Sequence, residues 1–401
     1  MAVKFLSMNK SLLIANLLLF VSVFSSTAQK INPDQAFKNA EAQTQLLLKE
    51  TDQAKKAERP DLIFPRTIEK GKLRLVASKD WTSGFFPGVL WFLYEYTNKN
   101  EWADQAKKFS AEMEKEKTNA GTHDMGFKMF CSIGTGYRLT KDPHYKEIII
   151  QSAKTLATRF NPNTGVIRSW DHNRDKWVNP VIIDNMMNLE LLFEATKLTG
   201  DSSLYKIAVS HANTTIKNHF RKDYSSYHVI DYDPNTGAVL KKNTHQGYSH
   251  ESAWARGQAW GLYGYTLCYR YTKDPAYLKQ AENIAAYLLN HPNMPKDLVP
   301  YWDFNAPNIP KEPRDVSAAA VIASGLYELS TYSKQKKLYK AKADVILQSL
   351  AKSYTAPAGE NKGFILLHST GSKPMDSEVD VPLNYADYYY LEALLRYKSL
   401  K

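Results

Sequence analysis

A repeated pattern of two helices joined by a short turn most constrains how this chain can fold. In each copy an apolar helix ends in Tyr-Thr, Leu-Thr or a close variant, a polar turn with Asp and often Pro follows, and a second helix begins at Tyr or Leu. Such residues end one helix and start the next. The copies lie at Trp91–Phe109, Gly136–Ala153, Leu192–Ala208, Tyr269–Ala285 and Leu326–Ala343, with an opening helix at Gln35–Gln53 and a half copy at Asn384–Tyr397.

The segments between the copies distinguish an open solenoid from a closed ring. Turns inside each copy are short, whereas the segments leading into each first helix are long and variable, unlike the constant period of a solenoid. The first helices are rich in Gly, Ala and Ser, as an inner ring needs, and the second helices carry more Lys and Glu. We therefore predict an all-α fold, an (α/α)6 barrel of six helical hairpins over residues 29–401, with active-site loops at one mouth. A short β-hairpin is expected at Tyr227–Leu240.

One loop is unusually rich in polar and aromatic residues. Thr244–Trp260 (THQGYSHESAWARGQAW) runs directly into an apolar helix. Arginine presents a planar charged fork that suits a carboxylate, and tryptophan presents a flat apolar face on which a sugar can stack. The stretch therefore favours a carbohydrate site. The alternative is that Trp254 and Trp260 belong to the core and that Arg256 forms an ordinary salt bridge.

Two aspartates, Asp124 in THDMGF and Asp184 in VIIDNMMN, stand where a loop meets a helix. A helix N-cap is the ordinary role for Asp at such a place. Asp184 is flanked by Ile and Met, however, and apolar surroundings raise the pKa of a carboxyl until it can act as an acid. Two carboxyls in different environments are the usual equipment for breaking a glycosidic bond.

Net charge, the N-terminal segment and the cysteines indicate which partners and which cellular compartment to expect. The net charge of +11 favours anionic partners, but the lysines are scattered, which argues against nucleic acid. Residues 1–28 have the basic, apolar and small-residue regions of a secretory signal, too short to span a membrane comfortably, so we expect an exported and soluble, periplasmic protein. Cys131 and Cys268 read as buried free thiols, and Cys/His metal spacing is absent.

At these residues the sequence resembles the unsaturated glucuronyl hydrolases of glycoside hydrolase family 88 over nearly all of the mature chain. The matching segments are DWTSGFFPGVLW (Asp80–Trp91), HDMGF (His123–Phe127), VIIDNMMNLELL (Val181–Leu192), THQGYSHESAWARGQAWGLYG (Thr244–Gly264), YWDFNAP (Tyr301–Pro307), RDVSAAA (Arg314–Ala320) and NYADYYYLEAL (Asn384–Leu394).

The resemblance implies roles for individual residues. Asp184 matches the general acid/base and Asp124 the second essential aspartate. The positions that match substrate-binding residues are Trp81, His123, Trp170, His228, Gln246, Trp254, Arg256 and Trp260. The implied substrate is an oligosaccharide with a 4,5-unsaturated uronic acid at its non-reducing end, and no metal or organic cofactor is implied.

The polysaccharide from which the substrate derives stays open. In this family a serine/lysine loop near the C-terminus is associated with sulfated substrates, and Ser369, Ser372 and Lys373 match it approximately, so sulfated glycosaminoglycan disaccharides are expected; a flexible loop without that role is the alternative. Other functions considered are an unsaturated rhamnogalacturonyl hydrolase, a sugar epimerase using two histidines, and a non-catalytic glycan-binding helical-repeat protein.

Overall fold

The repeated turns of the sequence build helical hairpins in the computed structural model, which describes residues 31–55 and 59–400. In one turn, Thr272 Oγ1 accepts the N–H of Asp274 at 3.1 Å, and Asp274 Oδ1 accepts the N–H of Ala276 at 2.9 Å. The same two bonds recur over residues 140–144 and 199–203. The threonine therefore closes one helix while the aspartate caps the next, as the turn pattern predicts.

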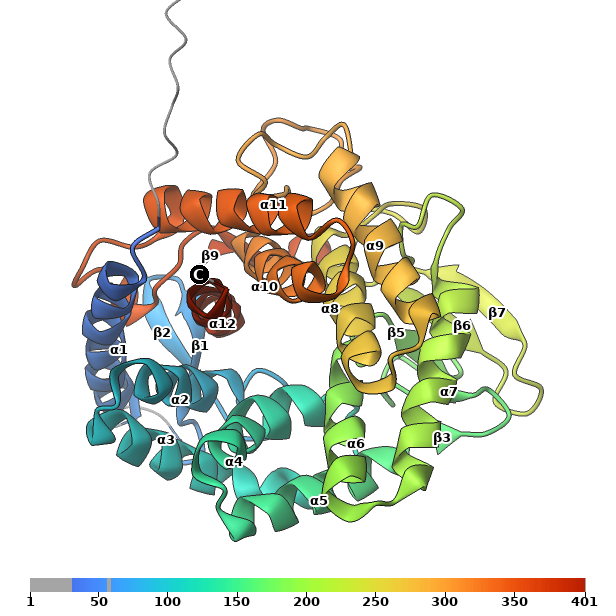
Figure 1. The fold of residues 1–401 in the computed structure, drawn as a ribbon, viewed down its shortest axis with the longest axis horizontal. Helices are drawn as coiled ribbons and strands as arrows, with labels where there is room; N and C mark the ends of the chain where they lie inside the picture. The colour runs from blue at the N-terminus through green and yellow to red at the C-terminus, as the bar shows by residue number, and fades with distance from the viewer. Residues whose placement is uncertain (1–30, 56–58, 401) are drawn as a thin grey trace, which may run out of the picture. The chain divides into compact units, whose positions relative to one another are not determined.

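In the described residues, five hairpins together with α1 and α12, which come from opposite ends of the chain, form two concentric rings of helices (Figure 1). The inner ring consists of α2 (Phe85–Thr97), a π-helix (Gly126–Gly134) continued by α4 (Thr135–Thr140), α6 (Asn185–Thr199), α8 (Ala255–Thr272), α10 (Val316–Tyr332) and α12 (Asn384–Ser399). The outer ring consists of α3 (Asn100–Met113), α5 (Pro143–Ala157), α7 (Ser202–His219), α9 (Pro275–Asn290), α11 (Lys336–Ser349) and α1 (Pro33–Lys55). Each inner helix contacts the next, and α12 contacts α2, which closes the predicted barrel.

Burial separates the two rings. In α10 every residue from Val316 to Ser330 is buried, and the run is dominated by small residues that allow neighbouring helices to approach closely. In its hairpin partner α11 only Tyr339, Ala343, Ile346 and Leu347 are buried. The prediction that first helices form the inner ring and second helices the outer ring is therefore confirmed.

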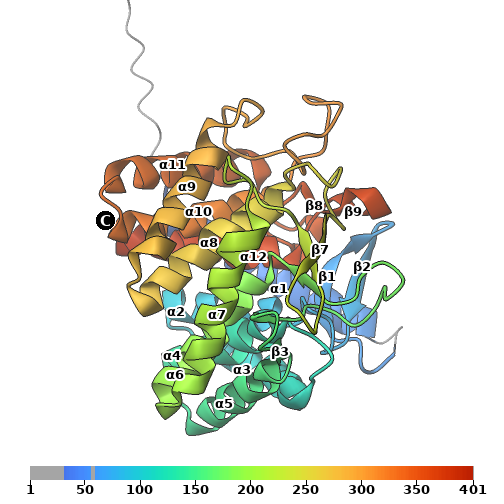
Figure 2. The same cartoon turned by 90° about the vertical axis from the view of Figure 1, so that its right-hand side faces the viewer.

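Short strands lie at one end of the barrel, where Figure 2 shows β1, β2, β7, β8 and β9 together. The strands are β1 (Phe64–Glu69), β2 (Lys72–Val76), β3 (Phe160–Asn161), β4 (Val166–Ile167), β5 (Pro180–Ile182), β6 (Val229–Tyr232), β7 (Val239–Asn243), β8 (Ser369–Ser372) and β9 (Ser377–Val381). All pairings are antiparallel, in the orders β1-β2, β3-β4, β5-β6-β7 and β8-β9. The hairpin predicted at Tyr227–Leu240 is β6-β7, to which β5 adds a third strand.

A close approach between two inner helices sets the position of both aspartates. A Cβ on Gly126 would lie 2.6 Å from Cα of Asn188, so only glycine allows the π-helix to contact α6 this closely. Asn188 Oδ1 accepts the N–H of Phe127 at 3.1 Å across the same contact. Asp124 precedes Gly126 by two residues, and Asp184 precedes Asn188 by four. The contact therefore holds the beginnings of the two segments together.

Three further expectations concern the signal segment, the two cysteines and membrane-spanning helices. The predicted signal, residues 1–28, lies outside the described residues, whereas residues 31–401 form one unit. Cys131 and Cys268 are buried and free, as predicted. Within the described ranges no helix has both the length and the apolar character needed to cross a bilayer.

Candidate active site

Asp184 stands directly before α6, but its side chain makes no N-cap hydrogen bond, unlike that of Asp274 before α9. It is 8% exposed, and its Oδ2 is buried without a hydrogen-bond partner. Burial raises the pKa of Asp184 to about 7; the charge of Arg256 opposes this shift and the charge of Asp124 adds to it. The carboxyl is thus partly protonated near neutral pH and can act as a proton donor.

His228 fixes one side of this carboxyl. Its Nδ1 accepts the backbone N–H groups of His245 and Gln246, each at 3.1 Å, so the proton of the neutral ring lies on Nε2. Burial holds the pKa of His228 well below its usual value, which keeps the ring neutral. Nε2 lies 3.8 Å from Asp184 Oδ2. The backbone of the 244–260 loop therefore selects the tautomer that presents an N–H near the acid.

Asp124 lies in more polar surroundings than Asp184. Its Oδ1 is 3.2 Å from His123 Nε2, and its Oδ2 accepts the hydroxyl of Thr122 at 3.2 Å. Burial lowers the pKa of His123, although the charge of Asp124 opposes this. The structure therefore combines one carboxyl in an apolar environment with a second in a polar one, which is the arrangement that separates acid from stabilising roles.

The guanidinium of Arg256 is buried and donates hydrogen bonds to other groups of the protein. Its Nη1 donates to Asp315 Oδ2 at 2.8 Å and to the carbonyl of Thr370 at 2.6 Å, and its Nη2 donates to the carbonyl of Gly371 at 2.6 Å. Its Nε is buried without a partner. Protein groups thus hold both terminal nitrogens but leave the N–H of Nε free, so the predicted role as a fork for the substrate carboxylate stays a prediction. The guanidinium acts on the site through its charge, which lowers the pKa of Asp184.

Trp254 and Trp260, for which the sequence predicts stacking on a sugar, are instead packed inside the protein. Trp260 is 0% exposed, and its ring packs against Phe127 with centroids 5.1 Å apart. Trp254 is 3% exposed and lies between contacts to the His228 ring at 4.6 Å and the Arg256 guanidinium at 4.5 Å. Neither ring has a free face for a sugar. Trp260 lies close enough to Asp184 for its indole N–H to lower the pKa of that carboxyl.

Two further tryptophans lie at the rim of the same site. Trp81 is half-buried, and its ring centroid is 5.0 Å from that of Tyr385 and 5.5 Å from that of Phe127. Trp170 packs against His245 at 5.3 Å and lies 6.4 Å from His228. The structure therefore brings both predicted tryptophans to the mouth of the barrel.

The predicted serine/lysine loop is a β-hairpin, β8-β9, tied to the site. Gln246 Nε2 donates to the carbonyl of Gly371 at 3.0 Å, the same oxygen that Arg256 contacts. Ser369 is fully buried and its hydroxyl has no hydrogen-bond partner, so its predicted contact with a sulfate stays a prediction. Ser372 is buried with a hydroxyl that has no partner, whereas Lys373 is partly exposed to solvent.

Buried polar atoms without partners gather at this end of the barrel. They include Asp184 Oδ2, His228 Nε2, Trp170 Nε1, Arg256 Nε, Tyr385 Oη and His123 Nδ1. Because desolvated polar groups normally find partners, such a cluster indicates where a polar ligand completes the hydrogen bonding. It lies at the loop end of the inner helices, where Asp184 and Trp254 precede the first turns of α6 and α8.

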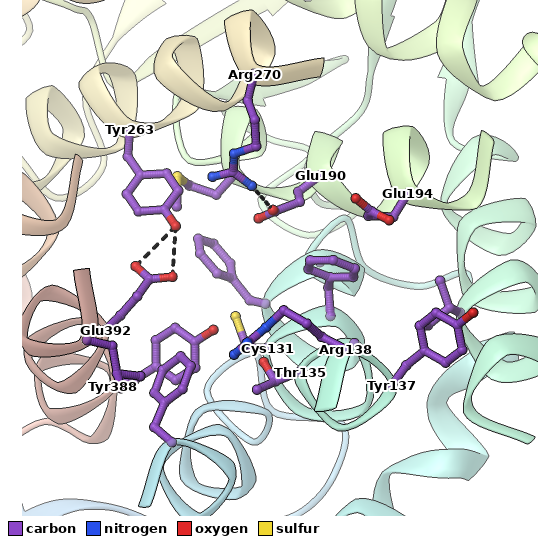
Figure 3. Close-up of a pocket in the computed structure, with 18 of the residues that line it drawn as sticks. Cys131, Thr135, Tyr137, Arg138, Glu190, Glu194, Tyr263, Arg270, Tyr388 and Glu392 are labelled. Carbon is purple, nitrogen blue, oxygen red and sulfur yellow. Dashed lines mark hydrogen bonds and ion pairs between the residues drawn. The ribbon is translucent and has the colours of Figure 1, made fainter. Parts of the chain in front are cut away.

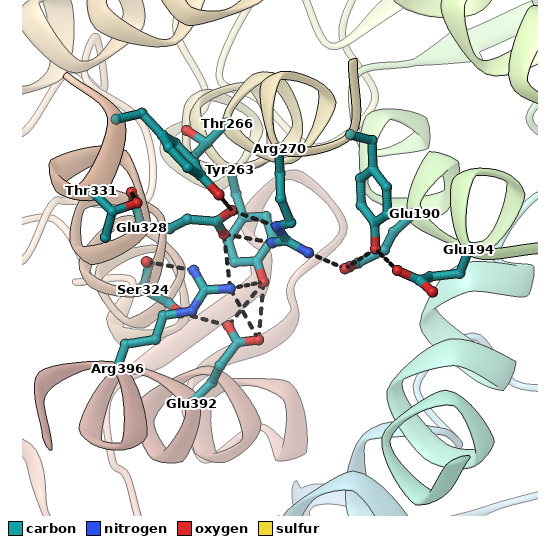
Figure 4. A network of polar contacts seen from close by, with 12 residues as sticks. Glu190, Glu194, Tyr263, Thr266, Arg270, Ser324, Glu328, Thr331, Glu392 and Arg396 are labelled. Atoms are coloured by element: carbon teal, nitrogen blue, oxygen red, sulfur yellow. Dashed lines mark hydrogen bonds and ion pairs between the residues drawn. The ribbon is translucent and has the colours of Figure 1, made fainter. Parts of the chain in front are cut away.

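A cavity of about 540 Å³ lies mainly among the C-terminal halves of the inner helices instead (Figure 3). Arg270 pairs there with Glu190 and Glu328, and Arg396 pairs with Glu328 and Glu392 (Figure 4). No side chain in its lining, all of it described, carries a buried polar atom without a partner. Three glutamates thus face two arginines at the floor of the barrel, and this network offers no unsatisfied buried group to a substrate.

Comparison with known proteins identifies the family. The model of Glycosyl Hydrolase Family 88 matches residues 61–398. The chain belongs to this family. It is a glycoside hydrolase.

The relatives of this family 88 hydrolase are similar over most of their length. An unsaturated glucuronyl hydrolase of Formosa agariphila is 52% identical over 342 residues, covering 84% of this chain and 85% of that protein. The crystal structure of an unsaturated glucuronyl hydrolase specific for heparin matches with a TM-score of 0.87 at 48% identity, covering 92% and 98% of the two chains. An unsaturated glucuronyl hydrolase mutant from Streptococcus agalactiae, complexed with dGlcA-GalNAc6S, matches with a TM-score of 0.75 at 31% identity and 92% coverage of both.

Sequence reasoning missed two residues of this family 88 site. Asp315 is fully buried, caps α10 by accepting the N–H of Ser317 at 3.1 Å, and pairs with Arg256. Tyr385 is also fully buried, with an unpartnered hydroxyl and its ring 5.5 Å from the Arg256 guanidinium. Both stand in segments quoted for the resemblance, RDVSAAA and NYADYYYLEAL. Within residues 31–55 and 59–400, no three His, Cys, Asp or Glu side chains are grouped to hold a metal ion.

Proposed function

We propose that this glycoside hydrolase removes the 4,5-unsaturated uronic acid from the non-reducing end of lyase-generated glycosaminoglycan oligosaccharides. The observation that carries the proposal is Asp184, a buried carboxyl with a pKa of about 7 that caps no helix. Relatives named as unsaturated glucuronyl hydrolases and unsaturated chondroitin disaccharide hydrolases support it. The second carboxyl, Asp124, and the neutral His228 complete the group of side chains around the acid.

The substrate is a vinyl ether, with its C4=C5 bond conjugated to the carboxylate and the ring oxygen attached to C5. Asp184 transfers its proton to C4, and positive charge develops at C5 and on the ring oxygen. Asp184, now ionised, then accepts a proton from the water that adds to C5. One carboxyl thus serves as acid and then as base, and its pKa near the working pH suits both steps.

The hydrated product is a hemiketal at C5. Its ring opens to a ketone, the ring oxygen takes up the released proton, and C1 becomes a hemiacetal that collapses to an aldehyde and releases the remaining sugar as an alcohol. One water is consumed in total. Because no bond forms between sugar and enzyme, the carboxyl separations that classify ordinary glycosidases do not apply.

Activity should depend on pH through Asp184. Protonation of C4 needs the acid form, so kcat/KM falls as pH rises through about 7, the pKa of Asp184 in the folded protein. The charge of Asp124 raises that pKa. Asp124→Asn should therefore move the alkaline fall of kcat/KM to lower pH, in addition to lowering activity by about tenfold or more.

The measurement is a pH–rate profile of wild type and Asp124→Asn on one unsaturated disaccharide. Thr122→Val is the matched control, because it removes a hydroxyl that contacts Asp124 Oδ2 while keeping both charges. An alkaline limb that stays in place, or moves to higher pH, in Asp124→Asn would contradict the assigned electrostatic coupling.

The activity itself is tested by ultraviolet absorbance of the conjugated alkene. Lyase digests of chondroitin, hyaluronan and heparin, and of rhamnogalacturonan as the alternative substrate, are each mixed with the protein. A fall of absorbance with the glycosaminoglycan digests is the expected result. Loss of absorbance with the rhamnogalacturonan digest alone would favour the rhamnogalacturonyl activity.

Two finer points belong to the same proposal. The basic chain, with a net charge of +11, and the partly exposed Lys373 beside Ser372 support sulfated substrates. The basic start, apolar run and small residues of positions 1–28 support export to the periplasm after cleavage of a signal peptide.

A further inference from the structure

One buried arginine outside the group around Asp184 joins two loops of the barrel. Arg159 lies between the end of α5 and the start of β3, and its side chain is 4% exposed. Its Nη1 donates to the carbonyl of Ala120 at 2.6 Å. Its Nε and Nη2 donate to the carbonyls of Arg168 and Ser169, at 2.9 and 3.2 Å. Because a guanidinium holds its donors in one rigid plane, this side chain fixes the three carbonyls relative to one another.

Both of these loops contain residues of the active site. Ala120 precedes His123 by three positions and Asp124 by four, and Ser169 directly precedes Trp170. The guanidinium therefore fastens the loop that carries the second carboxyl to the loop that carries a tryptophan of the rim.

The backbone of Ser169 continues this connection to the segment before the acid. The N–H of Ser169 donates to the carbonyl of Pro180 at 2.9 Å, and its Oγ accepts the N–H of Ile182 at 2.9 Å. Pro180 and Ile182 are the ends of β5, and Ile182 precedes Asp184 by two positions. A short path of hydrogen bonds thus joins the segment before Asp124 to the strand before Asp184.

This path complements the contact between Gly126 and Asn188. That contact holds the two aspartate segments together on their helical side, whereas Arg159 holds them together on their loop side. The charge of the guanidinium also reaches the site. Burial lowers the pKa of His123, Asp124 opposes this shift, and Arg159 adds to the effect of burial.

We propose that Arg159 is a positioning residue for the hydrolysis, which fixes the Asp124 carboxyl relative to Asp184 without touching the substrate itself. The proposal rests on the proposed function for the role of Asp184, but not on the source of the substrate. Without the guanidinium, the 120–124 loop loses its bond to residues 168–169, and Asp124 shifts away from the acid. A displacement of about 1 Å in an active site can cost about 10²-fold in rate.

The first test measures kcat and KM for three variants, corrected for the folded fraction. In Arg159→Met, kcat should fall by about tenfold or more, and Arg159→Lys should restore part of it because its ammonium replaces one of the lost donors. Arg168→Met is the matched control: Arg168 pairs with Asp171, as Arg159 does, but its side chain is 37% exposed. It should keep kcat within about twofold. Arg159→Lys alone is compared with this control if Arg159→Met does not fold.

The second test is a pH–rate profile, which a purely structural role would leave in place. Besides burial, the charge of Asp124 raises the pKa of Asp184. Displacement of Asp124 should therefore move the alkaline fall of kcat/KM to lower pH in both Arg159 variants. Adding Arg159→Met or Arg159→Lys to Asp124→Asn should move it no further, because the charge that Arg159 positions is already gone. An unmoved alkaline fall in the Arg159 variants, or an equal further shift in the Asp124→Asn background, would overturn the proposal.

A titration without substrate separates this proposal from the proposed function. The protein is labelled with ¹³C at its Asp carboxyl carbons, and the Asp184 signal is assigned by its absence in Asp184→Asn. The Asp184 carboxyl should titrate at lower pH in the Arg159 variants than in wild type or Arg168→Met. If wild type hydrolyses no unsaturated disaccharide, the proposed function fails, and this shift still supports the positioning role. Equal titration in all of these proteins overturns the positioning role even where turnover is normal.

Discussion

Asp184→Asn should abolish turnover while leaving a folded protein that binds its substrate. Removing a general acid costs about 10²- to 10⁴-fold, and we expect the upper end because the same carboxyl also assists the water. The amide keeps the size of the side chain but has no proton to give to C4. The absorbance assay measures kcat, and equilibrium binding of an unsaturated disaccharide measures the affinity, which should stay within about threefold because the side-chain shape is kept.

The same substitution should stabilise the protein at alkaline pH. Asp184 has its pKa raised from 3.8 to about 7 in the folded state. The unfolded chain therefore loses this proton first, and the folding free energy becomes less favourable as pH rises from 3.8, with the full cost present above 7. Asn carries no such cost, so the variant should gain of the order of 2–4 kcal/mol over wild type at pH 8 and little at pH 4. Thermal unfolding at the two pH values measures the difference.

Asp387→Asn is the matched control, because burial raises the pKa of Asp387 to about 7 as well. Its two oxygens accept the backbone N–H groups of Ile365 and Leu366, at 2.9 and 2.8 Å. An amide can accept only through its oxygen, so this variant should lose stability by about 1–3 kcal/mol but keep its turnover per folded molecule. Substantial activity in Asp184→Asn, or its equal loss in Asp387→Asn, would contradict the assignment of Asp184 as the acid.

The sequence predicts those features that depend on local chemistry. Thr272 and Asp274 determine a turn by bonds to residues within four positions, so the hairpins, their number and the closed ring could be inferred from the repeated pattern. Asp184 could be recognised because its apolar neighbours adjoin it in the chain. The hairpin β6-β7 likewise depends on alternation and a turn within one short segment.

Features that depend on distant partners could not be inferred. Arg256 reaches Asp315 and the carbonyl of Gly371, 59 and 115 positions away, and no local pattern reveals that protein groups hold both of its terminal nitrogens. The polar and aromatic residues around Trp260 in the sequence suggest a stacking role for it, but packing against Phe127 closes its ring off from solvent. The sequence indicates a loop at Ser369, whereas pairing of β8 with β9 places this residue in a buried strand. In each case tertiary packing decides what a recognised residue can do.

The ion pair of Arg256 and Asp315 leads to the largest expected effect on stability. Both side chains are buried, 1% and 0% exposed, and Nη1 lies 2.8 Å from Oδ2. Arg256→Met should destabilise the protein by about 3–5 kcal/mol, because Asp315 is left buried and uncompensated. The carbonyl of Thr370 would lose its bond from Arg256, and that of Gly371 would keep only the bond from Gln246, which loosens β8 from α8. Urea denaturation measures the loss.

A double-mutant cycle with Asp315→Asn separates the pair from its other contacts. The double variant leaves neither charge alone, so its loss should be smaller than the sum of the two single losses. Arg138→Met is the control: Arg138 is half exposed and pairs with Glu95, so about 1 kcal/mol or less is expected. One outcome is that Arg256→Met raises KM but unfolds at the same urea concentration as Arg138→Met. Arg256 would then bind the substrate carboxylate directly. A large loss of stability with coupling to Asp315 instead makes Arg256 the group that joins α8, α10 and β8 and lowers the pKa of Asp184 from inside the protein.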